Sequence, residues 1–119
     1  MEEENKLSFD LEKALEMVDQ DKEFLKELMG IFNSDYPQKL AVIYQAIKEK
    51  DFKTLNEIAH GLKGAAGNLF LTKIYELTLD LENKGKMNKI EGAEETYKKL
   101  EEELEQFKKF VSQPEWRER

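Results

Sequence analysis

The sequence predicts an all-α fold, an antiparallel four-helix bundle with a short additional N-terminal helix. First, apolar residues recur every three or four positions through most of the chain, which is the spacing of one face of an α-helix. Second, no segment shows the alternating pattern of a β-strand. Third, the breaks between helical segments are short, which favours antiparallel neighbours. We expect one domain over residues 1–119, with the bundle at about 9–112 and flexible ends.

The first two helices are predicted from their caps and apolar spacing. Ser8 or Asp10 can cap a short helix, which residues 19–21 (Asp-Gln-Asp) interrupt. A long helix follows from Asp21, and because a proline inside a helix removes a backbone hydrogen bond, Pro37 predicts a kink or short break near residues 33–35. The residues of the long helix that we expect to face inward are Phe24, Leu25, Leu28, Met29, Phe32, Tyr36, Leu40, Ile43, Tyr44 and Ile47.

Three further helices complete the expected bundle. Lys50 and Asp51 form too short a connection for anything but a hairpin, so the helix at 51–70 should lie antiparallel to the long helix. The next helix follows an apolar repeat over 71–81 and is expected to stop at 83–86, Asn-Lys-Gly-Lys. The last begins at about Ile90 and forms the fourth wall of the bundle. Since the apolar face of each helix can be covered within the bundle, we expect a monomer.

Composition excludes several classes of function. Twenty-six acidic residues against nineteen basic ones give a net charge of −7, which argues against a general affinity for nucleic acids or anionic membranes. The chain has no cysteine and one histidine, so disulfides, thiol chemistry and a zinc site are not expected. The N-terminal MEEENKLSFD is acidic, unlike a secretory signal, and no apolar run approaches the roughly 18 residues of a spanning helix. A cytoplasmic protein is predicted.

The segment 51–70 holds the only histidine and three of the six glycines. In a helix, His60 lies opposite the apolar stripe and is therefore exposed. Gly64 and Gly67 lie on the histidine side, where they leave the ring uncovered and let another surface come close, although Gly67 could instead begin the helix end. Each glycine costs about 1 kcal/mol relative to alanine, which indicates a functional reason. The apolar stripe consists of Leu55, Ile58, Leu62, Ala65 and Leu69.

Residues 60–69 read HGLKGAAGNL. This run resembles the H-x-L-K-G-[AS]-[AS]-G-N-[LI] signature of histidine-containing phosphotransfer (HPt) domains. The likeness extends over residues from Phe9 to Ala59, with Asp51 and Ala59 in family-like places, so it covers most of the chain. One departure is Phe70, because the family often has a small residue after the Asn-Leu pair.

The resemblance implies a phosphoryl carrier of a two-component phosphorelay, which accepts phosphate on His60 and has no ATP site of its own. An exposed imidazole with a pKa near the reference value of about 6.5 is largely neutral at pH 7 and can attack phosphorus. Lys63, one turn along, would stabilise the phosphoryl group as an ammonium donor. The implied partners are response-regulator receiver domains and a sensor or hybrid histidine kinase. No cofactor or metal of its own is expected, because the receiver would supply Mg²⁺.

The expected partner-binding residues come from the helix that bears His60 and from the helix beside it. The hairpin register places Val42 level with His60 and out of phase with the core, so it is a candidate apolar contact. The full set of expected contact residues is Lys53, Asn56, Glu57, Gly64, Gly67 and Val42.

Two other functions compete with the carrier hypothesis. A phosphate-independent helical adaptor would bind a receiver or kinase through the same face, and it should bind equally well after His60→Gln. The phosphoacceptor segment of a histidine kinase is disfavoured, because such segments typically have an acidic residue after the histidine, whereas Gly61 follows here. Nothing downstream resembles a nucleotide-binding domain.

Overall fold

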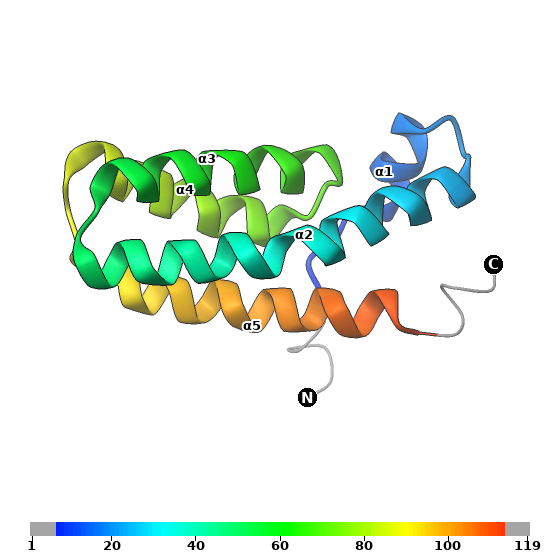
Figure 1. Cartoon of the computed structure of the whole chain (residues 1–119). Helices are drawn as coiled ribbons and strands as arrows, with labels where there is room; N and C mark the ends of the chain where they lie inside the picture. The colour runs from blue at the N-terminus through cyan, green and yellow to red at the C-terminus, as the bar shows by residue number, and fades with distance from the viewer. Residues whose placement is uncertain (1–6, 114–119) are drawn as a thin grey trace.

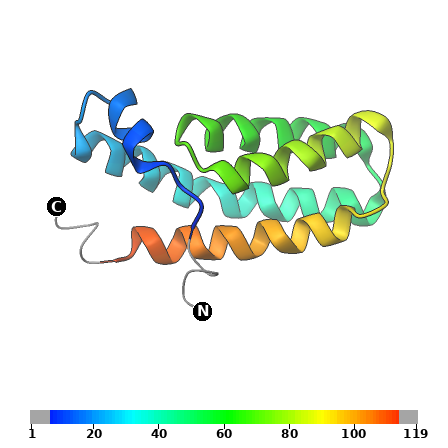
Figure 2. The ribbon, with the colours of Figure 1, turned by 180° about the vertical axis from the view of Figure 1, so that it is seen from behind.

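The structure, a computed structural model, describes residues 7–113. Within them the chain forms five helices and no strand, and four of the helices pack as an antiparallel bundle (Figure 1). The short first helix lies beside the N-terminal end of α2, which extends past the ends of α3 and α4 (Figure 2). This confirms the predicted fold class, while the expected flexible ends fall largely outside the described residues. The helices are α1 (Leu11–Met17), α2 (Lys22–Glu49), α3 (Phe52–Asn68), α4 (Thr72–Met87) and α5 (Ala93–Val111).

Aspartates begin the first three helices. The carboxylates of Asp10, Asp21 and Asp51 each accept a hydrogen bond from the backbone N–H three residues later, at 3.2, 3.1 and 3.2 Å. Such caps satisfy backbone donors that the first turn leaves without an intrahelical partner. The α2–α3 hairpin is as expected, and Lys50 makes the turn in the left-handed conformation with φ of 56°.

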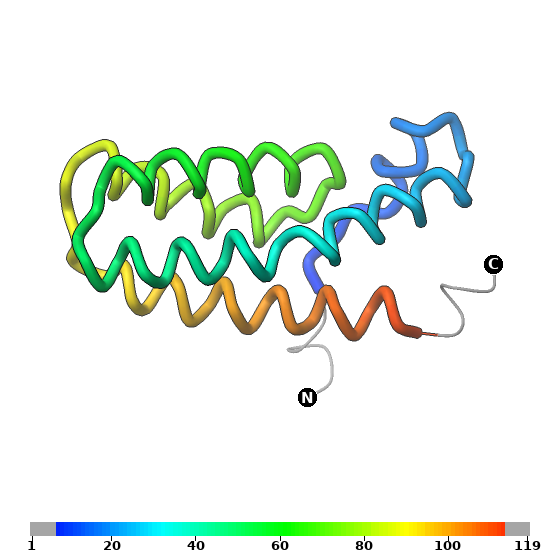
Figure 3. The backbone as a smooth tube through the Cα atoms, viewed as in Figure 1, coloured from blue at the N-terminus to red at the C-terminus, as the bar shows by residue number. Residues whose placement is uncertain are grey.

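Of the kink or short break predicted near residues 33–35 of α2, the break is absent, because the helix continues through Pro37. Figure 3 shows the axis of α2 bending midway, in keeping with a kink. The chain thus accommodates the missing hydrogen bond by curvature. Phe24 and Tyr44 do not face inward, since they are 47% and 43% exposed. Phe24 lies near the end of α2, and Tyr44 packs against Tyr97 at the surface with ring centroids 5.3 Å apart.

The core stripe of α3 includes Leu55, Leu62 and Leu69 as predicted, but at two positions the buried residue is the one after the predicted residue. Ile58 and Ala65 are only partly buried, whereas Ala59 and Ala66 are fully buried. Two small residues at the centre of the buried face leave room for closely packed neighbours. The buried residues of the stripe are Leu55, Ala59, Leu62, Ala66 and Leu69.

The expected stop of α4 at residues 83–86 is wrong. The helix continues to Met87, and Asn88 ends it in the left-handed conformation with φ of 54°. Gly85 is instead a buried interior residue of α4. A Cβ atom there would lie only 2.7 Å from the backbone nitrogen of Asn56 on α3. The glycine therefore permits a close approach of two helices and is not a helix terminator.

Helix α5 closes the bundle and begins at Ala93, three residues later than expected. Gly92, with φ of 78°, precedes it in a conformation that favours glycine. Phe107 on α5 is fully buried and meets the ring of Phe32 edge to face, with centroids 5.0 Å apart. None of the described helices combines the length and apolar character that crossing a membrane requires.

The connection between α3 and α4 carries the one departure from the resembled motif. Phe70 adopts a left-handed conformation with φ of 59°, which strains a residue that has a Cβ atom. Its carbonyl accepts a hydrogen bond of 3.0 Å from the backbone N–H of Asp10, just before α1. This turn therefore also attaches the N-terminal segment to the bundle.

Candidate functional site

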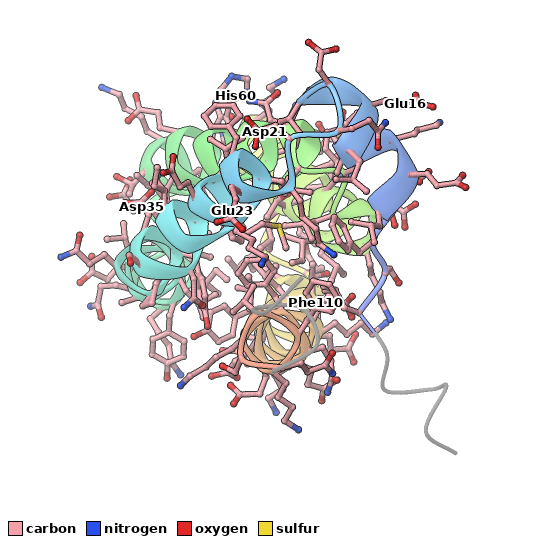
Figure 4. The ribbon with its side chains drawn as sticks, turned by 90° about the vertical axis from the view of Figure 1, so that its right-hand side faces the viewer. Glu16, Asp21, Glu23, Asp35, His60 and Phe110 are labelled. Carbon is pink, nitrogen blue, oxygen red and sulfur yellow. The ribbon has the colours of Figure 1, made fainter. Side chains whose placement is uncertain are left out.

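His60 lies on the outer surface of α3, as the sequence predicted. Its side chain is 67% exposed, and Figure 4 shows it at the edge of the molecule away from Phe110 of α5. A Cβ atom added at Gly61 or Gly64 would meet nothing within 4 Å. The surface around the imidazole is therefore open to an approaching molecule.

A buried carboxylate on the neighbouring helix holds the imidazole. Glu82 of α4 has a side chain that is only 3% exposed, and its Oε2 atom lies 2.8 Å from Nδ1 of His60. Its other oxygen, Oε1, lies 2.7 Å from Nζ of Lys63. Nζ of Lys86 lies 3.5 Å from Oε2. We call these four residues the Glu82 cluster.

The charges of the cluster keep Glu82 ionised. The hydrogen bond from Lys63 is the main cause that lowers the pKa of Glu82 from 4.5 to about 2, and it outweighs burial, which acts in the opposite direction. The hydrogen bond from His60 and the charge of Lys86 add to the lowering. The same hydrogen bond raises the pKa of Lys63 above its ordinary value. At neutral pH the cluster thus contains a carboxylate and two ammonium groups.

An ionised carboxylate fixes the tautomer of His60. A carboxylate can only accept hydrogen bonds, so at a distance of 2.8 Å the proton must reside on Nδ1. In the neutral ring, Nε2 then carries the lone pair. The carboxylate also stabilises positive charge that develops on the ring, as the aspartate does in serine-protease triads. The exposed histidine is therefore prepared as a nucleophile at Nε2.

Lys63 and Lys86 differ in how far they are exposed to solvent within the Glu82 cluster. Lys63, expected to stabilise a phosphoryl group, is only 18% exposed and is bound to Glu82. Lys86, which was not predicted as a site residue, is 57% exposed and lies at the margin of the site. Two cations therefore stand near His60, one held by the carboxylate and one extending into solvent.

Glu82 was not predicted from the sequence, because the residue belongs to another helix than His60 and resembles many other acidic residues of the chain. One signal was present. Glu82 follows Ile74 and Thr78 at intervals of four, so it continues the core-facing side of α4, where an ionisable residue is unusual.

The structure divides the six expected partner-binding residues into two groups. Lys53, Glu57, Gly64 and Val42 are exposed. Asn56 and Gly67 are partly buried, and each contacts α4.

Gly67 therefore has a packing role within the chain. A Cβ atom at this position would lie 3.1 Å from the Tyr75 ring, so the missing side chain admits that ring. Its role in docking a partner stays a prediction.

An apolar hollow of about 380 Å³ lies between α1, α2 and the C-terminal end of α3. Phe24 and Ile31 of α2, which are 47% and 65% exposed, contribute to its wall together with Met17 of α1, which is 43% exposed. On α3 the hollow is lined by Ala65, Asn68 and Leu69, which lie in the turns beyond His60. Among residues 7–113 there is no group of three or more acidic, histidine or cysteine side chains that could hold a metal ion.

Three comparisons relate the chain to known proteins. Residues 27–110 match the model of the Hpt domain family. The multistep phosphorelay regulator 1 of Schizosaccharomyces pombe is 30% identical over 82 residues, which cover 68% of this chain but only 28% of that protein. The crystal structure of histidine-containing phosphotransfer protein B from Pseudomonas aeruginosa PAO1 superposes with a TM-score of 0.84. It is 19% identical, and the match covers 94% of this chain and 97% of that one.

Proposed function

The chain belongs to the Hpt domain family, and on this premise we propose that it is a phosphoryl carrier of a two-component phosphorelay that is phosphorylated on Nε2 of His60. Similarity to a phosphorelay regulator supports the pathway. The observation that carries the choice of atom is the 2.8 Å contact between Nδ1 of His60 and the ionised Glu82. This contact leaves the Nε2 lone pair facing solvent.

The transfer follows from this geometry. The Nε2 lone pair attacks the phosphorus of a receiver's aspartyl phosphate in line, the new N–P bond forms, and the bond from phosphorus to the aspartyl oxygen breaks. The carboxylate leaves with its electron pair and remains on the receiver. The ring gains positive charge, which Glu82 stabilises through Nδ1–H. Reversal of the same step onto a second receiver releases the imidazole.

The two lysines neutralise the charge that arrives. Lys86 has an exposed ammonium that can turn from Glu82 toward phosphoryl oxygens. Lys63 keeps Glu82 ionised and can share its ammonium with the same oxygens, which retains a role for it in phosphate stabilisation. We do not assign an ATP site or a resident metal to this chain; the phosphoryl donor and Mg²⁺ belong to the partner.

The surface on which a receiver would dock includes the exposed residues around His60 and the apolar hollow between α1, α2 and α3. Proximity along α3 supports this assignment, because Gly64, where an added Cβ atom would meet nothing within 4 Å, lies in the sequence between His60 and the hollow-lining residues Ala65 and Asn68. Exposed side chains such as Ile31 lose water contact when covered, which favours association. A sensor or hybrid kinase can use the same face. A cytoplasmic location and a monomeric state stay predictions.

The test is phosphate acceptance. The protein and its His60→Gln variant are incubated with a phosphorylated receiver and Mg²⁺, and we expect alkali-stable, acid-labile phosphate on the first protein alone. Since His60 is 67% exposed, the variant should keep its helical circular dichroism spectrum. Equal labelling of both proteins would disprove the assignment of His60. Receiver binding that is unchanged by His60→Gln, with no label on either protein, would favour the adaptor.

A further inference from the structure

Gly85 marks a close approach of α4 to the backbone of α3. A Cβ atom there would lie 2.7 Å from the backbone nitrogen of Asn56 and 2.9 Å from its Cα. These are backbone atoms, which cannot turn aside as the end of a flexible side chain can. Gly85 follows Glu82 by three residues, and Asn56 precedes His60 by four, so this contact lies one helical turn from the His60–Glu82 pair.

A second glycine supports the same two helices on the other side of the pair. Gly67 follows His60 by seven residues, and Tyr75, which its missing side chain admits, precedes Glu82 by seven. A Cβ atom at Gly67 would lie 3.1 and 3.3 Å from two atoms of the Tyr75 ring. The His60–Glu82 contact is thus bracketed by two glycines, one on each of the helices that it joins.

The hydrogen bond between the helices is short enough to depend on this spacing. Relieving the Gly85 contact from 2.7 Å to the 3.4 Å of ordinary packing requires a displacement of 0.7 Å. Added to the 2.8 Å between Nδ1 of His60 and Oε2 of Glu82, the same displacement gives 3.5 Å. That separation lies beyond the 2.7–3.2 Å range of an N–H···O hydrogen bond.

We propose that Gly85, assisted by Gly67, is a positioning residue of the phosphotransfer site: it lets Glu82 reach Nδ1 of His60 and so keeps the lone pair on Nε2. The role of Gly85 in phosphoryl transfer rests on the proposed function, whereas its effect on the tautomer of His60 does not. A Cβ atom at position 85 would separate the helices and release the imidazole to exchange between its two neutral tautomers.

The first readout is the protonation of the two ring nitrogens, measured by ¹⁵N NMR of His60, the only histidine of the sequence, at an alkaline pH at which a histidine side chain is neutral. We expect the unmodified protein to show a protonated Nδ1 and an unprotonated Nε2. In Gly85→Ala the two signals should move toward the averaged values of mixed tautomers. Gly30→Ala is the matched control, because a Cβ atom there meets nothing within 4 Å, and its spectrum should not change.

The second readout is the rate of phosphate acceptance in a double-mutant cycle. We expect Gly85→Ala to slow acceptance by about ten- to a hundredfold, the scale of a misplacement near 1 Å. In a Glu82→Ala background the same substitution should cause no further loss, because the contact that it disturbs is already absent. A substitution that merely destabilised the bundle would slow both backgrounds equally, and that result would overturn the proposal.

The outcomes separate this inference from the proposed function. A folded Gly85→Ala protein with an unchanged His60 spectrum refutes the positioning role while phosphate acceptance by the parent protein still stands. A parent protein that accepts no phosphate refutes the carrier function, although the tautomer shift can still occur. If Gly85→Ala does not fold, the spectrum of the unmodified protein decides. Mixed tautomers of His60 in that protein would refute the proposal, because the close approach at Gly85 would then not hold Glu82 against Nδ1.

Discussion

Replacing Glu82 by glutamine should lower the stability of the folded chain at neutral pH. The amide has nearly the same shape but only one oxygen, whereas Lys63 and His60 each donate to a separate carboxylate oxygen at 2.7 and 2.8 Å. One donor must then face the amide NH₂ group. A hydrogen bond to a charged group contributes about 1.5–3 kcal/mol to the free energy of unfolding. Two effects reduce the loss: His60 and Lys86 are exposed, and an amide is easier to bury than a carboxylate. We expect a loss of about 2 kcal/mol.

The pH dependence of this loss has a definite sign. Since folding lowers the pKa of Glu82 from 4.5 to about 2, its contribution to stability is fully present above pH 4.5 and is lost as the pH falls toward 2. Glutamine does not titrate in this range. The difference in stability between the two proteins should therefore be largest above pH 4.5 and shrink steadily below it.

Thermal unfolding followed by circular dichroism measures both effects. For a chain of this length about 2 kcal/mol corresponds to a fall in Tm of roughly 6–12 °C. The control is Glu94→Gln, because Glu94 also pairs with a lysine, Lys48 at 3.8 Å, but is 68% exposed and should change Tm little. Equal Tm values for the parent and Glu82→Gln at pH 7, or a difference that persists undiminished near pH 2, would refute the assignment of Glu82 as an ionised, paired carboxylate.

Three other predictions concern the surface and the long helix. Phe24→Ser should weaken receiver binding about tenfold, measured by calorimetry, whereas Tyr44→Ser, equally exposed but on the α2–α5 side, should not. Lys86→Gln should slow phosphate acceptance by His60 about tenfold and leave Tm nearly unchanged, because its side chain is 57% exposed; an unaltered rate would exclude its role. Pro37→Ala should raise Tm by restoring a backbone hydrogen bond within α2, and a lower Tm would show that the bend is needed for packing.

Properties within one helix were predictable from the sequence, because residues three and four positions apart share a face. That periodicity gave the all-α class and the exposure of His60, and the ten residues from His60 gave the family resemblance. The errors within helices have local causes. Asn88, not the preceding Gly85, adopts the left-handed conformation that ends α4. Phe24 lies in the first turn of α2, where it lines the apolar hollow.

Only the tertiary structure decided which residues of α4 meet His60. Glu82 lies 22 positions further along, and its 2.8 Å contact depends on the register and separation of two helices, which no periodicity within either helix specifies. The separation depends in turn on how closely the two helices can approach each other. Gly85 and Gly67 allow a close approach because they have no side chain that would clash with the opposite helix. The sequence by itself therefore identified the exposed histidine, while the packing of α3 against α4 determined which ring nitrogen is left free to react.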